Sequence, residues 1–370
     1  MDYASAIYGC AAVICAALLA FTMTPIVRVL AFKIGAIDVP NDGRRMHTKP
    51  VPRIGGLAIF FAFVLTTLAF CEIDPTMLTI WVGGLVLVCM GVIDDVFRLK
   101  AWVKLIIQIA VAFIAVWQGV TIDYINFFGT YVNFGVWSIP ITVLWIVGLT
   151  NAINIIDGLD GLACGVSIIC SLSLFCVVLI SNRPSWALLT AILVGSCVGF
   201  FPFNHHPAKI FMGDTGALFL GYTLSILSIE GIFKTKMVLS FIIPLSIFGL
   251  PLFDTAFAIV RRIAKGESPF AADGEHIHHK LMKMGFGQKH SVRILYAVCG
   301  ILGISAVMFT HESTYKGAII ALSGFALFLL MYIIFKNEKL RRFTGMFDDE
   351  ASAEKEEKRE NEEQKDEEKK

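Results

Sequence analysis

The sequence predicts an all-α, polytopic integral membrane protein with about eleven transmembrane helices. Of its 370 residues, 56% are hydrophobic and only 16% are charged, whereas charged residues make up roughly 25% of a soluble domain. A helix needs about 20 apolar residues to cross a bilayer, and the chain contains eleven candidate stretches. They span residues 5–31, 54–71, 77–93, 101–120, 137–153, 162–180, 186–203, 216–230, 238–260, 292–310 and 316–335.

The distribution of basic residues predicts how these helices are oriented. No Lys or Arg precedes the first stretch, and its first basic residue, Arg28, lies at its far end. We therefore expect the N-terminus outside the cell and, after eleven spans, a cytoplasmic C-terminus. Most Lys and Arg residues then fall in cytoplasmic segments, as the positive-inside rule requires. The opposite face keeps only Arg183, Lys234, Lys236 and Lys316.

Composition divides the chain into a membrane-embedded domain at residues 1–340 and a charged tail at residues 341–370. From Asp348 to Lys370 the tail has 12 acidic and 6 basic residues. Such a segment cannot bury enough apolar surface to fold by itself, so we expect a disordered cytoplasmic tail. No nucleic-acid partner is expected.

Outside the tail, polar residues cluster in five segments, all on the predicted cytoplasmic side. The segments are residues 38–53, 94–104, 151–160, 204–214 and 261–290. Loops are polar because they meet water, which accounts for most of the Lys and Arg residues. It accounts less well for Asn154, Asp157 and Asp214, which adjoin apolar helices, where polar groups are costly and usually functional. We therefore expect the chemistry on this face.

Two of these segments have spacings that favour a phosphate or a metal ion. Asp94 and Asp95 end an apolar stretch and precede Lys104; such carboxylates suit Mg2+, which prefers oxygen ligands, although a solvated helix end is the alternative. Asn151 and Asn154 share one helix face, which Asp157 extends if the helix persists that far.

The remaining signals lie in loops and at a helix start. Asp214 stands at the entrance of an apolar stretch, where it would serve as an N-cap, as a metal ligand or as both. The run Gly158-Leu159-Asp160-Gly161 lets the backbone approach a flat ligand closely, with a capped turn as the alternative. The segment from His276 to Lys280 has no Cys nearby, so phosphate binding by His and Lys fits better than a closed zinc site.

At these residues the sequence resembles the polyprenyl-phosphate N-acetylhexosamine-1-phosphate transferases, and specifically the bacterial WecA/TagO-like branch that starts teichoic acid or O-antigen-type polymers. The last of the matching stretches looks like the GlcNAc-transferring branch, because the relatives that use UDP-MurNAc-pentapeptide have a different histidine loop. One departure is Arg98, which stands where some relatives have a third Asp. The stretches are DVPNDGRRMHTKPVPRIGG, GVIDD, NAINIIDGLDGLA, FMGDTGALFLG and RRIAKGESPFAADGEHIHHKL.

The resemblance implies transfer of GlcNAc-1-phosphate from UDP-GlcNAc to undecaprenyl phosphate, at the cytoplasmic face of a bacterial plasma membrane. It implies an Mg2+ cofactor, with Mn2+ as an alternative, held by Asn154 and Asp214. The implied catalytic residues are Asp94, Asp95, Asp157, His278 and His279. The implied substrate-binding residues are His47, Lys104, Asn151, Gly158, Leu159, Asp160, Phe211 and His276.

Three alternatives stay open at this point. The first is the same reaction with another sugar nucleotide, such as UDP-MurNAc-pentapeptide. The second is a secondary transporter, but transporters bind near the midplane, and here only Asp254 lies well inside a predicted helix, as a partner of Arg or His or as a relay. The third is a membrane prenyltransferase, which would need two spaced Asp-rich motifs. The sequence also leaves open whether the chain forms a homodimer.

Overall fold

The computed structural model describes residues 3–39, 50–127, 130–235, 240–266, 268, 276–310, 322, 324 and 325. His47, the charged tail and most of the predicted stretch 316–335 lie outside these residues. Within them, seven helices have the length and the apolar composition needed to cross a membrane. The protein is therefore a polytopic membrane protein, as predicted.

Twelve α-helices follow one another along the described residues. They are α1 (Tyr3–Ile34), α2 (Gly56–Phe70), α3 (Pro75–Phe97), α4 (Ala101–Trp117), α5 (Ser138–Ile156), α6 (Leu162–Ile180), α7 (Pro184–Asn204), α8 (Gly213–Ser228), α9 (Ile242–Ile247), α10 (Gly249–Ala264), α11 (Ile277–Lys283) and α12 (Gln288–Phe309). A π-helical turn, Ile229–Phe233, extends α8, and a 3-10 turn, Gly135–Trp137, precedes α5.

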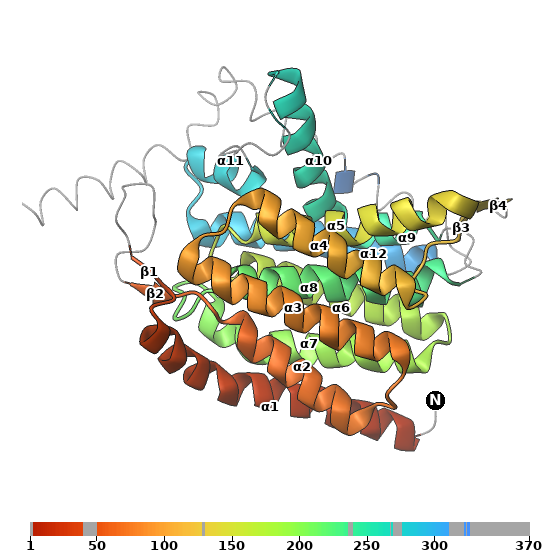
Figure 1. Ribbon diagram of the computed structural model, residues 1–370, viewed down its shortest axis with the longest axis horizontal. Helices are drawn as coiled ribbons and strands as arrows, with labels where there is room; N and C mark the ends of the chain where they lie inside the picture. Colours follow the sequence, from red (N-terminus) through yellow and green to blue (C-terminus); the bar gives the residue numbers. More distant parts are fainter. Residues whose placement is uncertain are drawn as a thin grey trace, which may run out of the picture.

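Two short antiparallel hairpins accompany the helices, which the prediction of an all-α chain did not include. β1 (Ile37–Asp38) pairs with β2 (Val51–Pro52), and β3 (Tyr124–Phe127) pairs with β4 (Thr130–Asn133). They lie at opposite ends of the bundle: β1 and β2 at the left of Figure 1, β3 and β4 at the right.

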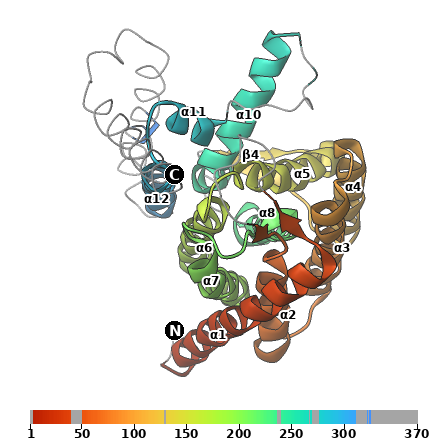
Figure 2. The same cartoon turned by 90° about the vertical axis from the view of Figure 1, so that its left-hand side faces the viewer.

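Helix α8 forms the centre of the bundle, and all of its residues except Asp214 are buried. It contacts α2, α3, α5, α6 and α7, which surround it when the bundle is seen end-on in Figure 2. Glycines allow this close packing: a Cβ at Gly56 of α2 would overlap the backbone of Gly216, and a Cβ at Gly91 of α3 would overlap that of Thr215. The start of α8 is thereby held directly against α2 and α3.

The predicted stretch 238–260 is not one helix, so this prediction was wrong. The chain bends at Phe248, between α9 and α10 (φ −97°, ψ 15°). Pro251 has no N–H to donate, which suits the first turn of a helix and disfavours a helix interior. Helix α10 then projects from the bundle in both views (Figures 1 and 2).

Candidate active site

Three helix ends converge on the side chain of Lys104, which lies near the start of α4. Its Nζ donates to Asp214 Oδ2 at 2.8 Å, near the start of α8, and to Asp94 Oδ2 at 3.1 Å, near the end of α3. Asp94 also accepts a hydrogen bond from the Leu99 N–H, at 2.6 Å. Asp94, Lys104 and Asp214 therefore lie together, and their side chains are only partly exposed.

Asp95 faces the interior of the bundle, and only 3% of its side chain is exposed. Its Oδ2 accepts a hydrogen bond from Thr215 Oγ1 at 3.0 Å, and its Oδ1 lies 3.9 Å from Arg53 Nε. Asp95 thus joins α3 to the first turn of α8, and Arg53 brings the segment after β2 to the same place. Thr215 and Arg53 are contacts that sequence motifs alone did not assign.

Asn154 lies in the last turn of α5, and its side-chain amide is a polar neighbour of the Asp214 carboxylate. Asp157 does not extend the helix face, because α5 ends at Ile156 and Asp157 is its C-cap (φ −77°, ψ 54°). Desolvation of the Asp157 carboxyl, with the negative charges of Asp214 and Asp95, raises its pKa to about 8. The carboxylates of Asp157, Asp214 and Asp95 therefore lie close enough for their negative charges to repel one another.

The predicted role of Asp214 as an N-cap was wrong. The N-cap position of α8 is Met212, and Asp214 lies inside the first turn without a side-chain capping bond. Its carboxylate is directed to Lys104 instead. A negative charge in the first turn is still favourable because of the helix dipole.

Asn151 lies one turn before Asn154 but points toward a different neighbour. Its Nδ2 donates to Gln108 Oε1 of α4 at 2.5 Å and to the Val147 carbonyl at 2.8 Å. Gln108 is buried, and it lies four residues after Lys104. This contact joins α4 to α5 about one helical turn away from Lys104 and Asn154. A Gln in the middle of an apolar stretch was the signal in the sequence.

The loop after α5 is tied to the loop before α8 by Asp160. Its Oδ2 contacts His206 Nδ1 at 2.8 Å and accepts from the Ala208 N–H at 3.1 Å. His206 is a further site neighbour that the motifs did not assign.

Phe211 is held by β2 and the segment that follows it. The Phe211 N–H donates to Pro52 O at 2.8 Å, while Phe211 O accepts from the Gly55 N–H at 2.9 Å. Phe211 is thereby fixed by backbone bonds on both sides.

The histidine segment packs on the loop that follows α5. His278 is buried, and a Cβ at Gly158 would overlap its Nε2. The rings of His276 and His278 are nearly parallel, with centroids 5.9 Å apart, and the His279 ring lies 4.2 Å from that of His278. Burial and the neighbouring His279 lower the pKa of His278 to about 3, so this imidazole is neutral near neutral pH. The structure therefore brings the histidine segment into contact with the loop after α5, although the two lie far apart in the sequence.

The arrangement of the carboxylates suits a partly hydrated divalent cation. Asp94 and Asp214 both accept from the ammonium group of Lys104, and two neighbouring carboxylates favour a positive charge between them. Within the described residues, no three acidic, His or Cys side chains form a closed metal cage. Mg2+ is usually bound by one or two carboxylates and keeps several waters, so Asp214 with Asn154 fits this ion.

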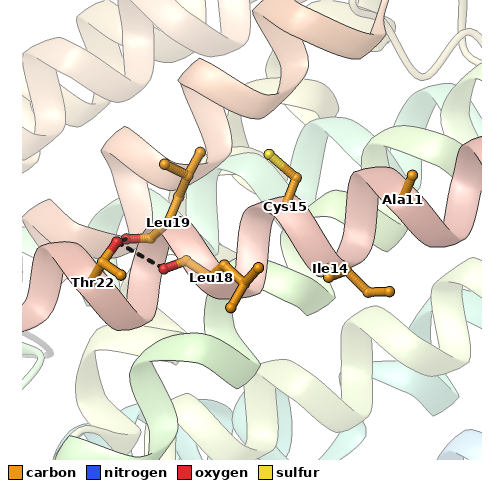
Figure 3. A pocket seen from close by; sticks show the side chains of 6 residues that line it. All are labelled: Ala11, Ile14, Cys15, Leu18, Leu19 and Thr22. Carbon is orange, nitrogen blue, oxygen red and sulfur yellow. Dashed lines mark hydrogen bonds between the residues drawn. The ribbon is translucent and has the colours of Figure 1, made fainter.

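The described residues also include an apolar cavity of about 510 Å3 at one face of α1. Figure 3 shows that its lining comes from α1 alone, and the Thr22 hydroxyl donates back to the carbonyl oxygens of Leu18 and Leu19. None of the polar residues of the candidate site lines it. We therefore assign it no part in the chemistry. Its lining residues are Ala11, Ile14, Cys15, Leu18, Leu19 and Thr22.

The fold and the polar cluster together define a membrane-embedded enzyme whose carboxylates, amide and lysine gather at one end of a helical bundle. Residues 77–232 match the family described as glycosyl transferase family 4. The chain is 44% identical over 337 residues to the probable undecaprenyl-phosphate N-acetylglucosaminyl 1-phosphate transferase of Bacillus subtilis strain 168, an alignment that covers 88% of this chain and 92% of the relative.

Two further relatives extend the comparison. The decaprenyl-phosphate N-acetylglucosaminephosphotransferase of Mycolicibacterium smegmatis is 33% identical over 323 residues, which is 79% of each chain. The undecaprenyl-phosphate alpha-N-acetylglucosaminyl 1-phosphate transferase of Escherichia coli K12 is 27% identical over 329 residues, 85% of this chain and 88% of the relative. This chain belongs to the family of polyprenyl-phosphate N-acetylglucosamine-1-phosphate transferases.

Proposed function

We propose that this protein transfers GlcNAc-1-phosphate from UDP-GlcNAc to undecaprenyl phosphate, forming undecaprenyl-diphospho-GlcNAc and UMP. This reaction would be the first membrane step of a teichoic acid or O-antigen-type pathway. The similarity to the Bacillus relative along 88% of the chain supports the substrates. The observation that carries the chemistry is the convergence of Asp94, Lys104, Asn154 and Asp214 from four helices.

The chemistry is a phosphoryl transfer, in which positioning and charge neutralisation do most of the catalytic work. An oxygen of the lipid phosphate forms a bond to the phosphorus that carries the sugar, and the bond from that phosphorus to UMP breaks with its electron pair leaving on UMP. A phosphate monoester has a second pKa of about 6, so the nucleophile is already largely ionised at neutral pH. Asp94, already engaged with Lys104, would therefore orient this phosphate more than deprotonate it.

Asn154 and Asp214 are the residues that would hold Mg2+, or Mn2+ in its place. The cation would supply electrostatic stabilisation of the diphosphate and of the departing UMP. Lys104 lies between Asp94 and Asp214 and would contribute a second positive charge. Because Lys104 offsets the negative charges of Asp94 and Asp214, a polyanionic substrate would be able to bind next to these carboxylates.

Nucleotide binding falls to the loops around Gly158 and Phe211. Phe211 would stack on the uracil ring, and Asp160 would accept the uracil N–H through Oδ1, because its Oδ2 is engaged by His206 and Ala208. His278 and His279 would lie at the diphosphate, with His276 beside them. The packing of His278 on Gly158 supports placing the diphosphate next to the uracil pocket.

We place the site at the cytoplasmic face of a bacterial plasma membrane, with the N-terminus outside. The excess of Lys and Arg at the site end of the helices supports this orientation. The lipid tail would then remain in hydrocarbon while the sugar nucleotide arrives from water. The apolar side chains exposed on the helices around the site would face the hydrocarbon that holds this tail.

The test is UMP release by the purified protein with Mg2+, undecaprenyl phosphate and a panel of UDP-sugars, with the lipid product identified by mass spectrometry. We expect product with UDP-GlcNAc and at most a small fraction of that rate with UDP-MurNAc-pentapeptide. Faster release with UDP-MurNAc-pentapeptide would reject the proposed substrate. Absence of release with every sugar nucleotide would reject the reaction.

A further inference from the structure

Asp254 is a buried carboxylate of α10 whose two oxygens are both used at the start of α11. Its Oδ2 contacts His276 Nδ1 at 3.1 Å, and its Oδ1 accepts from the Ile277 N–H at 3.0 Å. Both Asp254 and His276 are almost completely buried. A buried carboxylate is costly unless it is paired and hydrogen-bonded, and both bonds here are made to the segment that carries the histidines.

The contact with Ile277 stabilises the first turn of α11. The first N–H groups of a helix have no partner inside the helix, and the N-cap residue His276 makes no side-chain capping bond. Asp254 therefore supplies the cap from another helix. This holds a short helix in place although it is only seven residues long.

The contact with His276 also fixes which ring nitrogen carries the proton. An ionised carboxylate only accepts hydrogen bonds, so His276 donates through Nδ1, and Nε2 is left to face its other surroundings. The parallel rings of His276 and His278 then connect this anchor to Gly158. A continuous series of contacts runs from α10 to the loop that carries the predicted uracil pocket.

We propose that Asp254 is a positioning residue for the transfer reaction: it holds His276 with its proton on Nδ1 and anchors the start of α11, and so keeps His278 on Gly158. The inference rests on the proposed function for the reaction it serves. Asp254 acts through His276 and does not touch the substrate. In metal sites, removing a carboxylate that orients a histidine typically costs about 10- to 100-fold in activity, and we expect a loss of this size.

The discriminating variant is Asp254→Asn, which keeps the shape of the side chain. The Ile277 N–H is always a donor, so the Asn oxygen must face it and the Asn NH2 must face His276. His276 Nδ1 then has to accept, and its proton moves to Nε2. We expect kcat to fall about 10- to 100-fold with the KM for UDP-GlcNAc nearly unchanged, because the histidines act where charge develops in the transition state.

The experiment combines a double-mutant cycle with 15N NMR of histidine-labelled full-length protein, in which the His276 signal is assigned from its loss in His276→Ala. Asp254→Asn should add no further loss in a His276→Ala background, and the His276 signals should change from Nδ1–H to Nε2–H. Additive losses would overturn the proposal. So would native-like activity of Asp254→Asn.

Two controls separate folding from positioning. Thr255→Val alters the neighbouring residue of α10, whose hydroxyl donates to Pro251 O in its own helix, and it should retain native kcat and melting temperature. NMR of the native protein is a test that does not depend on the folding of any variant. A neutral His276 with its proton on Nε2 would overturn the proposal. Native protein with Nδ1–H on His276 but no transfer would contradict the proposed function while supporting the anchor of α11.

Discussion

The ammonium group of Lys104 lies 2.8 Å from Asp214 Oδ2, although 110 residues separate them in the sequence. The same ammonium donates to Asp94 Oδ2, so one lysine connects helices α3, α4 and α8. In doing so it neutralises carboxylates that would otherwise repel one another. The expected divalent cation and Lys104 would therefore both interact with the Asp214 carboxylate, and their competition for it can be measured.

Asp214→Asn should slow transfer strongly while the protein still folds. The substitution removes an expected cation ligand, and we expect a loss of about 100- to 1,000-fold in kcat, as for other groups that stabilise transition-state charge. Stability should fall by only about 1–3 kcal/mol, the usual range for a hydrogen bond to a charged group, because Lys104 keeps Asp94. Mn2+ binding, followed by electron paramagnetic resonance, should be lost as well.

Asp123→Asn is the matched control, because its carboxylate contacts Thr121 and Ser138 at the opposite end of the bundle. It should retain both transfer and Mn2+ binding. Near-native turnover of Asp214→Asn would remove Asp214 from the set of cation ligands.

Lys104→Met should bind Mn2+ more tightly than the native protein in the absence of substrates, and should transfer more slowly. Loss of a nearby positive charge should favour the cation by about 1.4 kcal/mol or more, a tenfold gain in affinity. Titration with Mn2+ measures this directly. The exposed Lys100→Met serves as control. Equal affinities in all three proteins would show that Lys104 and the cation do not compete for Asp214.

Phe211→Ala should weaken UDP-GlcNAc binding by about 1–3 kcal/mol if the ring stacks on the base. The backbone bonds of Phe211 to Pro52 and Gly55 do not involve the side chain, so the loop should keep its place. Isothermal titration calorimetry gives the affinity, and Phe211→Tyr should restore most of it. Native affinity in Phe211→Ala would place the uracil pocket elsewhere.

His278→Gln should flatten the pH dependence of stability on the acid side. The pKa of His278 is lowered to about 3 in the folded protein, against about 6.5 for a free histidine. The unfolded chain then takes up a proton that the folded protein does not, so this contribution to stability is complete above about pH 6.5 and is lost as the pH falls toward 3. By pH 5, about 2 kcal/mol of this contribution has been lost.

Melting temperatures at pH 7 and pH 5 provide the measurement. The difference between them should be smaller in His278→Gln than in the native protein, whereas the exposed His290→Gln should keep the native difference. An unchanged difference in His278→Gln would show that His278 is not buried as a neutral imidazole.

Labelling of single cysteines tests the orientation. In a Cys-free background, Lys289→Cys, at the site end of α12, should react with a membrane-impermeant maleimide only when the cytoplasmic face is open. Glu72→Cys, between α2 and α3, should react from outside. The reverse pattern would place the site on the outer face.

Much of the helical architecture was predictable from the sequence because the physics is local. A bilayer requires long apolar helices, so nearly every apolar stretch that the described residues cover became one, and the motif residues fell at helix ends. The exception is the stretch 238–260, where Pro251 favoured a new helix start within an apolar run. Hydropathy averaged over a window does not register such a break.

The sequence by itself determined which residues gather at one end of the bundle, because charged and amide side chains are excluded from hydrocarbon and their spacing marks the helix ends. Only the tertiary structure decided which of them pair. Asp160 contacts His206, Asn151 contacts Gln108, and Asp254 holds His276. Each pair joins different helices or loops, and its formation depends on how those segments pack against one another in the bundle. No local sequence pattern encodes the distance between two such segments, because that distance is set only when the chain folds.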